Sequence, residues 1–149
     1  MVIQYNRVKA KILLVEDNAA DIRLTTEVLQ KNSIVSKLDV VRDGVEAIEF
    51  LKKRGKYSNA KRPNLILLDL NLPKRDGFYV LEEIKNDEEL KKIPVVILTV
   101  SDAREDLIKA YNLHANCYII KPLEMREFYK IVNSIVNFWF TIVKNFEIE

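Results

Sequence analysis

Cysteine, glycine and proline are scarce in this 149-residue chain. Cys117 is the only cysteine, so no disulfide can form within the chain, and a reducing cytoplasm is the location that we expect. Only three glycines and four prolines occur, and neither the GxGxxG nor the GxxxxGK[ST] motif is present. The sequence therefore gives no support to a dinucleotide-binding or P-loop nucleotide site.

An excess of charge of one sign is also missing. Twenty-four basic residues face 22 acidic residues, which leaves a formal net charge of +2. This balance argues against nucleic acid or an anionic membrane surface as the main partner. No apolar run is long enough for a transmembrane helix, and the first eleven residues lack the apolar region of a signal peptide.

Short apolar runs alternate with longer amphipathic stretches along the chain. Nearly continuous apolar runs, typical of strands buried on both faces, occupy Lys11–Val15, Leu65–Leu68, Val95–Leu98 and Tyr118–Ile120. A weaker run at Leu38–Val41 suits an edge strand. Helical periods follow each run, namely Asp21–Gln30, the segments after the Asp43-Gly44 and Asp76-Gly77 turns, Asp102–Leu113 and Leu123–Val143. Five strand–helix units in strict alternation predict an α/β fold with a parallel sheet and helices on both faces.

We expect one domain over residues 1–149, with its core at about 11–136 and a last helix extended to about 143. The polar segment Lys53–Arg62 is predicted to be a solvated loop between the second helix and the third strand. Six residues after Val143 are too few for a DNA-binding or catalytic module, so we expect none to be attached there.

Chemically active side chains follow the ends of the predicted strands. Glu16 and Asp17 follow the first strand, Asp69 the third, Thr99 ends the fourth, and Lys121 follows the fifth. Because ligands of open α/β sheets bind beyond the carboxyl ends of the strands, we expect these groups to converge at one edge.

Carboxylates that lie close together repel each other unless a cation neutralises them. We expect Mg²⁺ to be this cation, because it prefers oxygen ligands. Open positions on the metal would suit phosphoryl oxygens, while Lys121 supplies an ammonium and Thr99 a hydroxyl. Asp69 is the candidate nucleophile, because carboxylates form aspartyl-phosphates. The edge is therefore predicted to carry out phosphoryl transfer.

These residues, with the Asp69–Gly77 run DLNLPKRDG and Lys121-Pro122, resemble the receiver domains of two-component response regulators. The resemblance covers roughly residues 11–136 and implies the flavodoxin-like strand order 2-1-3-4-5. It implies Asp69 as the phosphoacceptor, a metal site of Glu16, Asp17, Asp69 and the Asn71 backbone carbonyl, Thr99 and Lys121 as phosphoryl ligands, Tyr118 with Thr99 as the switch, and a cis Lys121-Pro122 bond. A histidine kinase is the implied phosphodonor, and the protein would not be an enzyme beyond its own phosphorylation and dephosphorylation.

Within that family, the long loop at 53–62 and the aromatic ending Phe138–Phe140 resemble stand-alone regulators that serve phytochrome-type kinases. A haloacid-dehalogenase-type phosphohydrolase, which also uses Asp and Mg²⁺, is the alternative. Members of that class resemble one another in having a second Asp two residues after the nucleophile. This chain has Asn71 at that position, and an amide cannot transfer a proton.

The last helix carries more apolar residues than one packed face needs. We expect Phe128, Ile131, Ile135, Phe138 and Ile142 to face the sheet, and Tyr129, Val136, Phe140 and Val143 to form a second stripe. An exposed stripe of this size indicates an interface, so a homodimer through the last helix, with parts of the fourth helix and fifth strand, is predicted.

Overall fold

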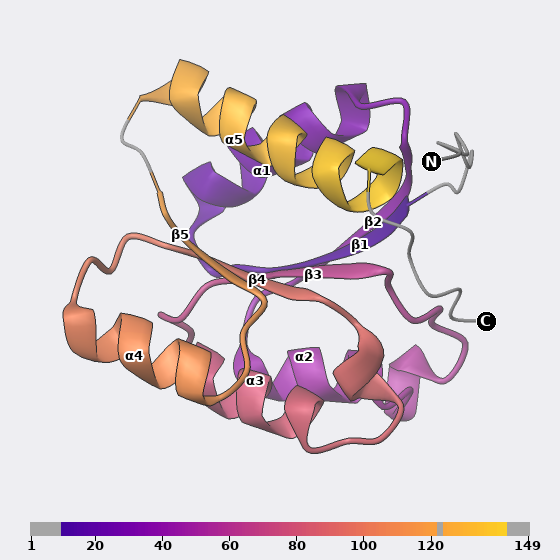
Figure 1. Cartoon of the computed structure of the whole chain (residues 1–149). Coiled ribbons are helices and arrows are strands. Elements are labelled where there is room, and N and C mark those ends of the chain that lie inside the picture. The colour runs from indigo at the N-terminus through magenta and orange to yellow at the C-terminus, as the bar shows by residue number, and fades with distance from the viewer. Residues whose placement is uncertain (1–9, 122–123, 143–149) are drawn as a thin grey trace.

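The computed structural model describes residues 10–121 and 124–142, and the side chains of residues 10–121 and 124–140. Strands and helices alternate along the chain (Figure 1). The strands are β1 (Ala10–Val15), β2 (Val35–Val41), β3 (Leu65–Leu68), β4 (Val95–Thr99) and β5 (Cys117–Ile120). The helices are α1 (Ala19–Lys31), α2 (Gly44–Leu51), α3 (Gly77–Lys85), α4 (Arg104–Asn112) and α5 (Met125–Asn137), with short 3₁₀ turns at Gly55–Tyr57 and Leu90–Lys92 and a π-helical turn at Phe138–Ile142.

The five strands form one parallel sheet in the order β2-β1-β3-β4-β5, which confirms the predicted order. Helices α1 and α5 cover one face, and α2, α3 and α4 cover the other (Figure 1). Successive strand residues point to opposite faces, so the apolar strands feed two separate cores. On β3, for example, Ile66 and Leu68 face α2 and α3, while Leu65 and Leu67 face α1 and α5.

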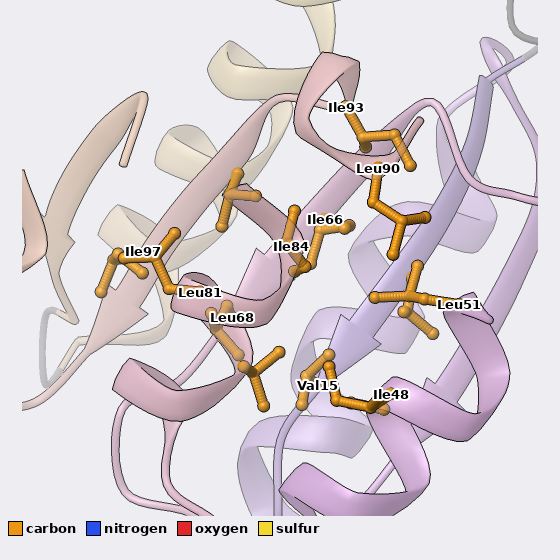
Figure 2. Packing of buried hydrophobic residues seen from close by; sticks show 14 of the residues in the cluster. Val15, Ile48, Leu51, Ile66, Leu68, Leu81, Ile84, Leu90, Ile93 and Ile97 are labelled. Carbon is orange, nitrogen blue, oxygen red and sulfur yellow. The ribbon is translucent and has the colours of Figure 1, made fainter. Parts of the chain in front are cut away.

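Figure 2 shows the core on the side of α2 and α3. There Val15, Ile66, Leu68 and Ile97 from the strands meet Ile48 and Leu51 of α2 and Leu81 and Ile84 of α3. Strands β1, β3 and β4 are buried on both faces, as their continuous apolar runs predict. The rigid centre of the sheet fixes the strand ends at which the candidate site residues lie.

Capping residues determine where three of the helices begin. Asn18, Asp43 and Asp76 have extended backbones, and each side chain accepts a hydrogen bond from the backbone N–H three residues later. These bonds satisfy N–H groups that would otherwise have no partner in the first turn. Helices α2 and α3 therefore start at the glycine of each Asp-Gly pair, close to where the sequence predicts.

Strand β5 is an edge of the sheet, as the expected order implies, but it is not buried on both faces as its apolar run predicts. It pairs only with β4 among the five strands, and its residues are partly exposed, with Ile120 exposed to 50%. The loop over 53–62 is largely exposed, as predicted, and none of its residues is buried. Its 3₁₀ turn directs Tyr57 back onto the body of the protein, where the hydroxyl contacts the Glu46 carboxylate and the ring packs edge-on against Phe50.

Helix α5 presents a different face to the sheet from the one predicted. Val136 and Phe140, expected in the exposed stripe, are buried against the body of the protein, whereas Phe138, expected inside, is 49% exposed. Phe128 and Ile135 are buried as predicted, and Tyr129 is exposed as predicted. The buried face of α5 consists of Phe128, Val132, Ile135 and Val136. Three consecutive aromatic residues, Phe138–Phe140, follow it, and the sequence pattern does not select which of them is buried. Val143 lies outside the described residues.

Two further expectations concern the rest of the chain. The Lys121-Pro122 bond involves a residue outside the described part, so its predicted cis form stays a prediction. Within residues 10–121 and 124–142, no helix is both long and apolar enough to cross a membrane.

Candidate functional site

Backbone hydrogen bonds extend the sheet by one residue at each strand end that carries a candidate site residue. The N–H of Glu16 donates to Val41 at 3.1 Å, that of Asp69 to Val15 at 3.0 Å, and that of Lys121 to Thr99 at 2.7 Å. Because parallel strands end at the same edge, these three side chains emerge side by side. The strand-end positions in the sequence predict this convergence.

The ammonium group of Lys121 lies at the centre of the site. Its Nζ is 2.5 Å from Glu16 Oε2, 3.0 Å from Asp69 Oδ2 and 2.8 Å from Asp21 Oδ2. The side chains of Glu16, Asp69 and Lys121 are only 4–6% exposed, so these charges interact with little screening by water. A buried carboxylate needs such a partner, since an unpaired buried charge is costly.

Burial and contact with one another and with Lys121 set the pKa values of the Glu16 and Asp69 carboxyl groups. Burial raises the pKa of Glu16 to about 7, and the nearby charge of Asp69 adds to this, although contact with Lys121 opposes it. Burial alone would raise the pKa of Asp69 as well. The Lys121 ammonium and hydrogen bonds to Asp69 reverse that effect, and the net pKa is lowered. Asp69 is thus held as a carboxylate, the form that can act as a nucleophile.

Asp21 belongs to the site although sequence reasoning does not place it there. Its position suggests only a role at the start of the first helix, yet its carboxylate contacts Lys121, 100 positions away in the chain. The capping bond itself runs from the Asp21 N–H to the Asn18 side chain at 3.0 Å. A sequence signal does exist, because Asp21 lies in the first turn of the helix that starts beside Glu16.

The other two predicted metal ligands lie at the surface. The Asp17 side chain is exposed, and its backbone carbonyl accepts a hydrogen bond from Arg42 Nη2 at 3.0 Å. Asn71 is exposed too, and its N–H donates to Asp69 Oδ1 at 3.1 Å. Carboxylates and a carbonyl at one edge are the oxygen donors that a hard divalent cation needs, so the residues fit such an ion. Within residues 10–121 and 124–142, no three acidic, His or Cys side chains are already arranged as a metal site. The Lys121 ammonium instead contacts the carboxylates of Glu16, Asp21 and Asp69.

Thr99 and Tyr118 are linked through one residue of the loop after β4. Thr99 is fully buried, and its Oγ1 accepts a hydrogen bond from the Ser101 N–H at 3.4 Å. The Tyr118 hydroxyl donates to the Ser101 carbonyl at 2.9 Å. The same loop residue thus contacts both predicted switch residues. Sequence reasoning misses Ser101, because its contacts to both residues come from the backbone.

Two glycines allow the loop after β3 to pack tightly beneath Asp69. A Cβ added to Gly77 would lie 2.3 Å from the Asp69 carbonyl oxygen, and one added to Gly44 would lie 2.1 Å from the Arg75 carbonyl oxygen. Both distances are impossible for real side chains. The Gly77 N–H donates to the Leu70 carbonyl at 2.9 Å, which ties the start of α3 to the residue after Asp69.

Comparison with known proteins agrees with this geometry. The family model "Response regulator receiver domain" matches residues 12–133. The response regulator Rcp1 of Synechocystis sp. is 52% identical over 132 residues, which are 89% of this chain and 90% of Rcp1.

Two solved structures match in both fold and sequence. The phosphorylated cyanobacterial phytochrome response regulator RcpA superimposes with a TM-score of 0.90 at 48% identity, covering 93% of this chain and 99% of RcpA. The Mn²⁺-bound form of Rcp1 superimposes with a TM-score of 0.88 at 49% identity, with the same coverage.

A five-stranded sheet in the order 2-1-3-4-5, an ionised buried aspartate paired with a lysine, and a family match over most of the chain lead to one assignment. The chain belongs to the response regulator receiver domains of two-component signal transduction.

Proposed function

We propose that Asp69 is the phosphoacceptor and that a histidine kinase is its donor. The observation that carries this proposal is the buried Asp69 carboxylate, held ionised by the Lys121 ammonium 3.0 Å away. A charged nucleophile at the carboxyl end of a central strand suits in-line attack on phosphorus. The crystallised relative RcpA is described as phosphorylated, which supports a phosphoacceptor role for this chain as well.

In the proposed reaction an oxygen of Asp69 attacks the phosphorus of a phosphohistidine. A phosphorus–oxygen bond forms while the phosphorus–nitrogen bond breaks, and the imidazole leaves with its electron pair. Lys121 offsets negative charge on the phosphoryl oxygens, and Thr99 supplies a hydroxyl donor. Hydrolysis of the acyl phosphate by water later returns Asp69 to its carboxylate and releases inorganic phosphate.

Magnesium would be held by Glu16, Asp17, Asp69 and the Asn71 carbonyl, and would neutralise charge that develops during the transfer. A relative, Rcp1, has been crystallised with Mn²⁺, a divalent ion with similar ligand preferences. Glu16 already lies in the cluster, and Asp17, its neighbour in the chain, has an exposed side chain that can reach an ion from solvent.

Phosphorylation of the purified protein tests the assignment of Asp69. Incubation with acetyl phosphate and Mg²⁺ should add the mass of one phosphoryl group to the wild type and none to Asp69→Asn, since an amide is a poor nucleophile. Glu88→Gln serves as the control, because this exposed glutamate lies at the opposite end of the sheet. A phosphorylated Asp69→Asn protein would refute the assignment.

The signal would leave the site through Thr99, Ser101 and Tyr118. A phosphoryl group that attracts the Thr99 hydroxyl would disturb its hydrogen bond with Ser101, and through Ser101 the bond to Tyr118. The residues 1–149 would act as a single receiver domain in the cytoplasm, with output through protein contacts and neither nucleic acid nor membrane as a partner. The likeness to RcpA supports a phytochrome-type kinase as the donor.

A homodimer through α4, β5 and α5 is the assembly that we propose. Exposed apolar side chains gather on these three elements, namely Leu107, Ile108 and Tyr111 on α4, Ile120 on β5, and Met125 and Tyr129 on α5. Strand β5 is the sheet edge between the two helices (Figure 1). A second copy would cover this apolar surface most simply, since twofold dimers are the commonest assembly.

Light scattering tests the dimer. The wild type should have the mass of a dimer at micromolar concentration, and the double variant Ile120→Glu, Met125→Glu should be a monomer. Val45→Glu is the matched control, because Val45 is an exposed apolar residue on α2, a helix outside the proposed interface. A monomeric wild type, or a double variant of unchanged mass, would contradict the proposed interface.

A further inference from the structure

The Lys121 ammonium has no free donor in this structure. A lysine ammonium has three N–H groups, and three carboxylate oxygens, from Glu16, Asp21 and Asp69, lie 2.5–3.0 Å from its nitrogen. An arriving phosphoryl oxygen can therefore gain a hydrogen bond from Lys121 only if one of the three carboxylates gives way.

Asp21 is directed to Lys121 because its usual local partner is already occupied. It is the third residue of α1, from which an acidic side chain commonly accepts a bond from the N-cap N–H. That N–H, of Asn18, donates instead to Glu16 Oε1 at 3.1 Å. The Asp21 carboxylate thus has no capping bond to make and bridges α1 to the end of β5.

Of the three contacts, the one with Asp21 is the easiest to break. The Asp21 side chain is 28% exposed, against 4% for Glu16 and 6% for Asp69. Water can hydrate a released Asp21 carboxylate, whereas a released Glu16 would be left buried and charged. Asp69 is the nucleophile and loses its charge only once the acyl phosphate has formed, so it still occupies its N–H group when the phosphoryl group arrives.

We propose that Asp21 is a positioning residue that retains the Lys121 ammonium in the unphosphorylated protein and releases it to the phosphoryl group. This inference rests on the phosphoacceptor role of Asp69 proposed above. Asp21 and a phosphoryl oxygen compete for the same N–H group, so the contact opposes phosphorylation and favours the unphosphorylated state.

The variant Asp21→Asn tests this competition, because it removes the charge but keeps the size of the side chain. With acetyl phosphate and saturating Mg²⁺, we expect it to gain the phosphoryl group about two- to fivefold faster than the wild type, a modest effect because partly exposed ion pairs are weak. Glu27→Gln is the matched control. It makes the same charge change at an exposed position of α1 and should phosphorylate at the wild-type rate.

A second measurement follows the Lys121 ammonium itself. In the metal-free protein, hydrogen exchange of the ammonium protons measured by NMR should be faster in Asp21→Asn than in the wild type and unchanged in Glu27→Gln. In a Lys121→Ala background, Asp21→Asn should no longer accelerate phosphorylation, since no ammonium remains to be released.

The outcomes separate the two proposals. A wild type that gains no phosphoryl group would refute the phosphoacceptor role. A wild type that is phosphorylated as fast as Asp21→Asn, or faster, would overturn only the inference about Asp21. Acceleration that persists in the Lys121→Ala background, or unchanged ammonium exchange, would overturn it equally.

Discussion

The hydroxyl of Tyr118 donates a hydrogen bond to the backbone carbonyl of Ser101 across 2.9 Å, and so fastens strand β5 to the loop after β4. The N–H of that same Ser101 bonds to Thr99, which ends β4 beside the site. The tyrosine ring is partly buried against the core on the α3–α4 side. Tyr118 therefore stabilises one conformation of a loop that starts at a predicted phosphoryl ligand.

Removing this hydroxyl should loosen the loop without affecting the chemistry. We expect Tyr118→Phe to lower the free energy of unfolding by about 1 kcal/mol, the usual net value of a hydrogen bond. Amide hydrogen exchange at residues 101–103 should become faster, while Asp69 is still phosphorylated. Tyr111→Phe is the control, because Tyr111 is 48% exposed on α4. Exchange as slow as in the wild type would show that the hydroxyl does not hold the loop.

Loss of the Asp17 charge should weaken the proposed metal site but not the fold. The side chain is exposed, so Asp17→Asn removes no core contact. Removing a residue that only hydrogen-bonds a metal ligand commonly lowers the affinity for the metal about tenfold or more. Removing a ligand itself should lower it at least as much, so we expect the affinity of Asp17→Asn for Mg²⁺ to fall about tenfold or more. Calorimetric titration of the variant and of Glu88→Gln would measure it. Equal affinities in the two proteins would remove Asp17 from the ligand set.

The stability of the metal-free protein should depend on the protonation of Glu16. Burial raises the pKa of this carboxyl from 4.5 to about 7 in the folded chain. Between these values the folded state binds more protons than the unfolded state, so the contribution of Glu16 to the free energy of unfolding falls as pH rises from 4.5 to 7.

The variant Glu16→Gln does not titrate in that range. In urea unfolding with a chelator at pH 5 and pH 7, the wild type should lose more free energy of unfolding between the two values than the variant does. A variant that loses as much as the wild type would contradict the raised pKa. Added Mg²⁺ should bind more tightly at the higher pH, because it competes with the proton on Glu16.

The close approach of Gly77 to Asp69 predicts a strong effect of a single methyl group. Gly77→Ala places Cβ 2.3 Å from the Asp69 carbonyl oxygen, so the loop must move, at a cost of about 1–3 kcal/mol in the free energy of unfolding. Phosphorylation should slow as well, because the displaced backbone carries the nucleophile.

Gly55→Ala is the informative comparison for this variant. Its Cβ would meet nothing within 4 Å, but its φ of +55° is strained for alanine, at about 1 kcal/mol. It lies in the loop after α2, so the rate of phosphorylation should be unchanged. A normal rate in Gly77→Ala would mean that the loop after β3 does not position Asp69.

The parallel α/β fold and most of the site follow from the residues alone, whereas the strand order 2-1-3-4-5 is implied by the resemblance to receiver domains. Strands buried on both faces must be continuously apolar, and the residues that end them must meet at one edge. Glu16, Asp69 and Lys121 are therefore identifiable as neighbours from their strand-end positions, although they are far apart in the chain. Their side-chain chemistry and the resemblance to receiver domains then indicate phosphoryl transfer.

Tertiary packing alone decided the remaining features. Three consecutive aromatic residues, Phe138–Phe140, follow α5, so only packing against the body of the protein decides that Phe140 is buried and Phe138 exposed. Asp21 has a plausible local role as a capping residue, and it reaches Lys121 only because α1 and the end of β5 approach one another in space. The sequence pattern shows which side chains can be buried or paired. Which of several suitable partners a side chain contacts depends on distances that exist only in the folded chain.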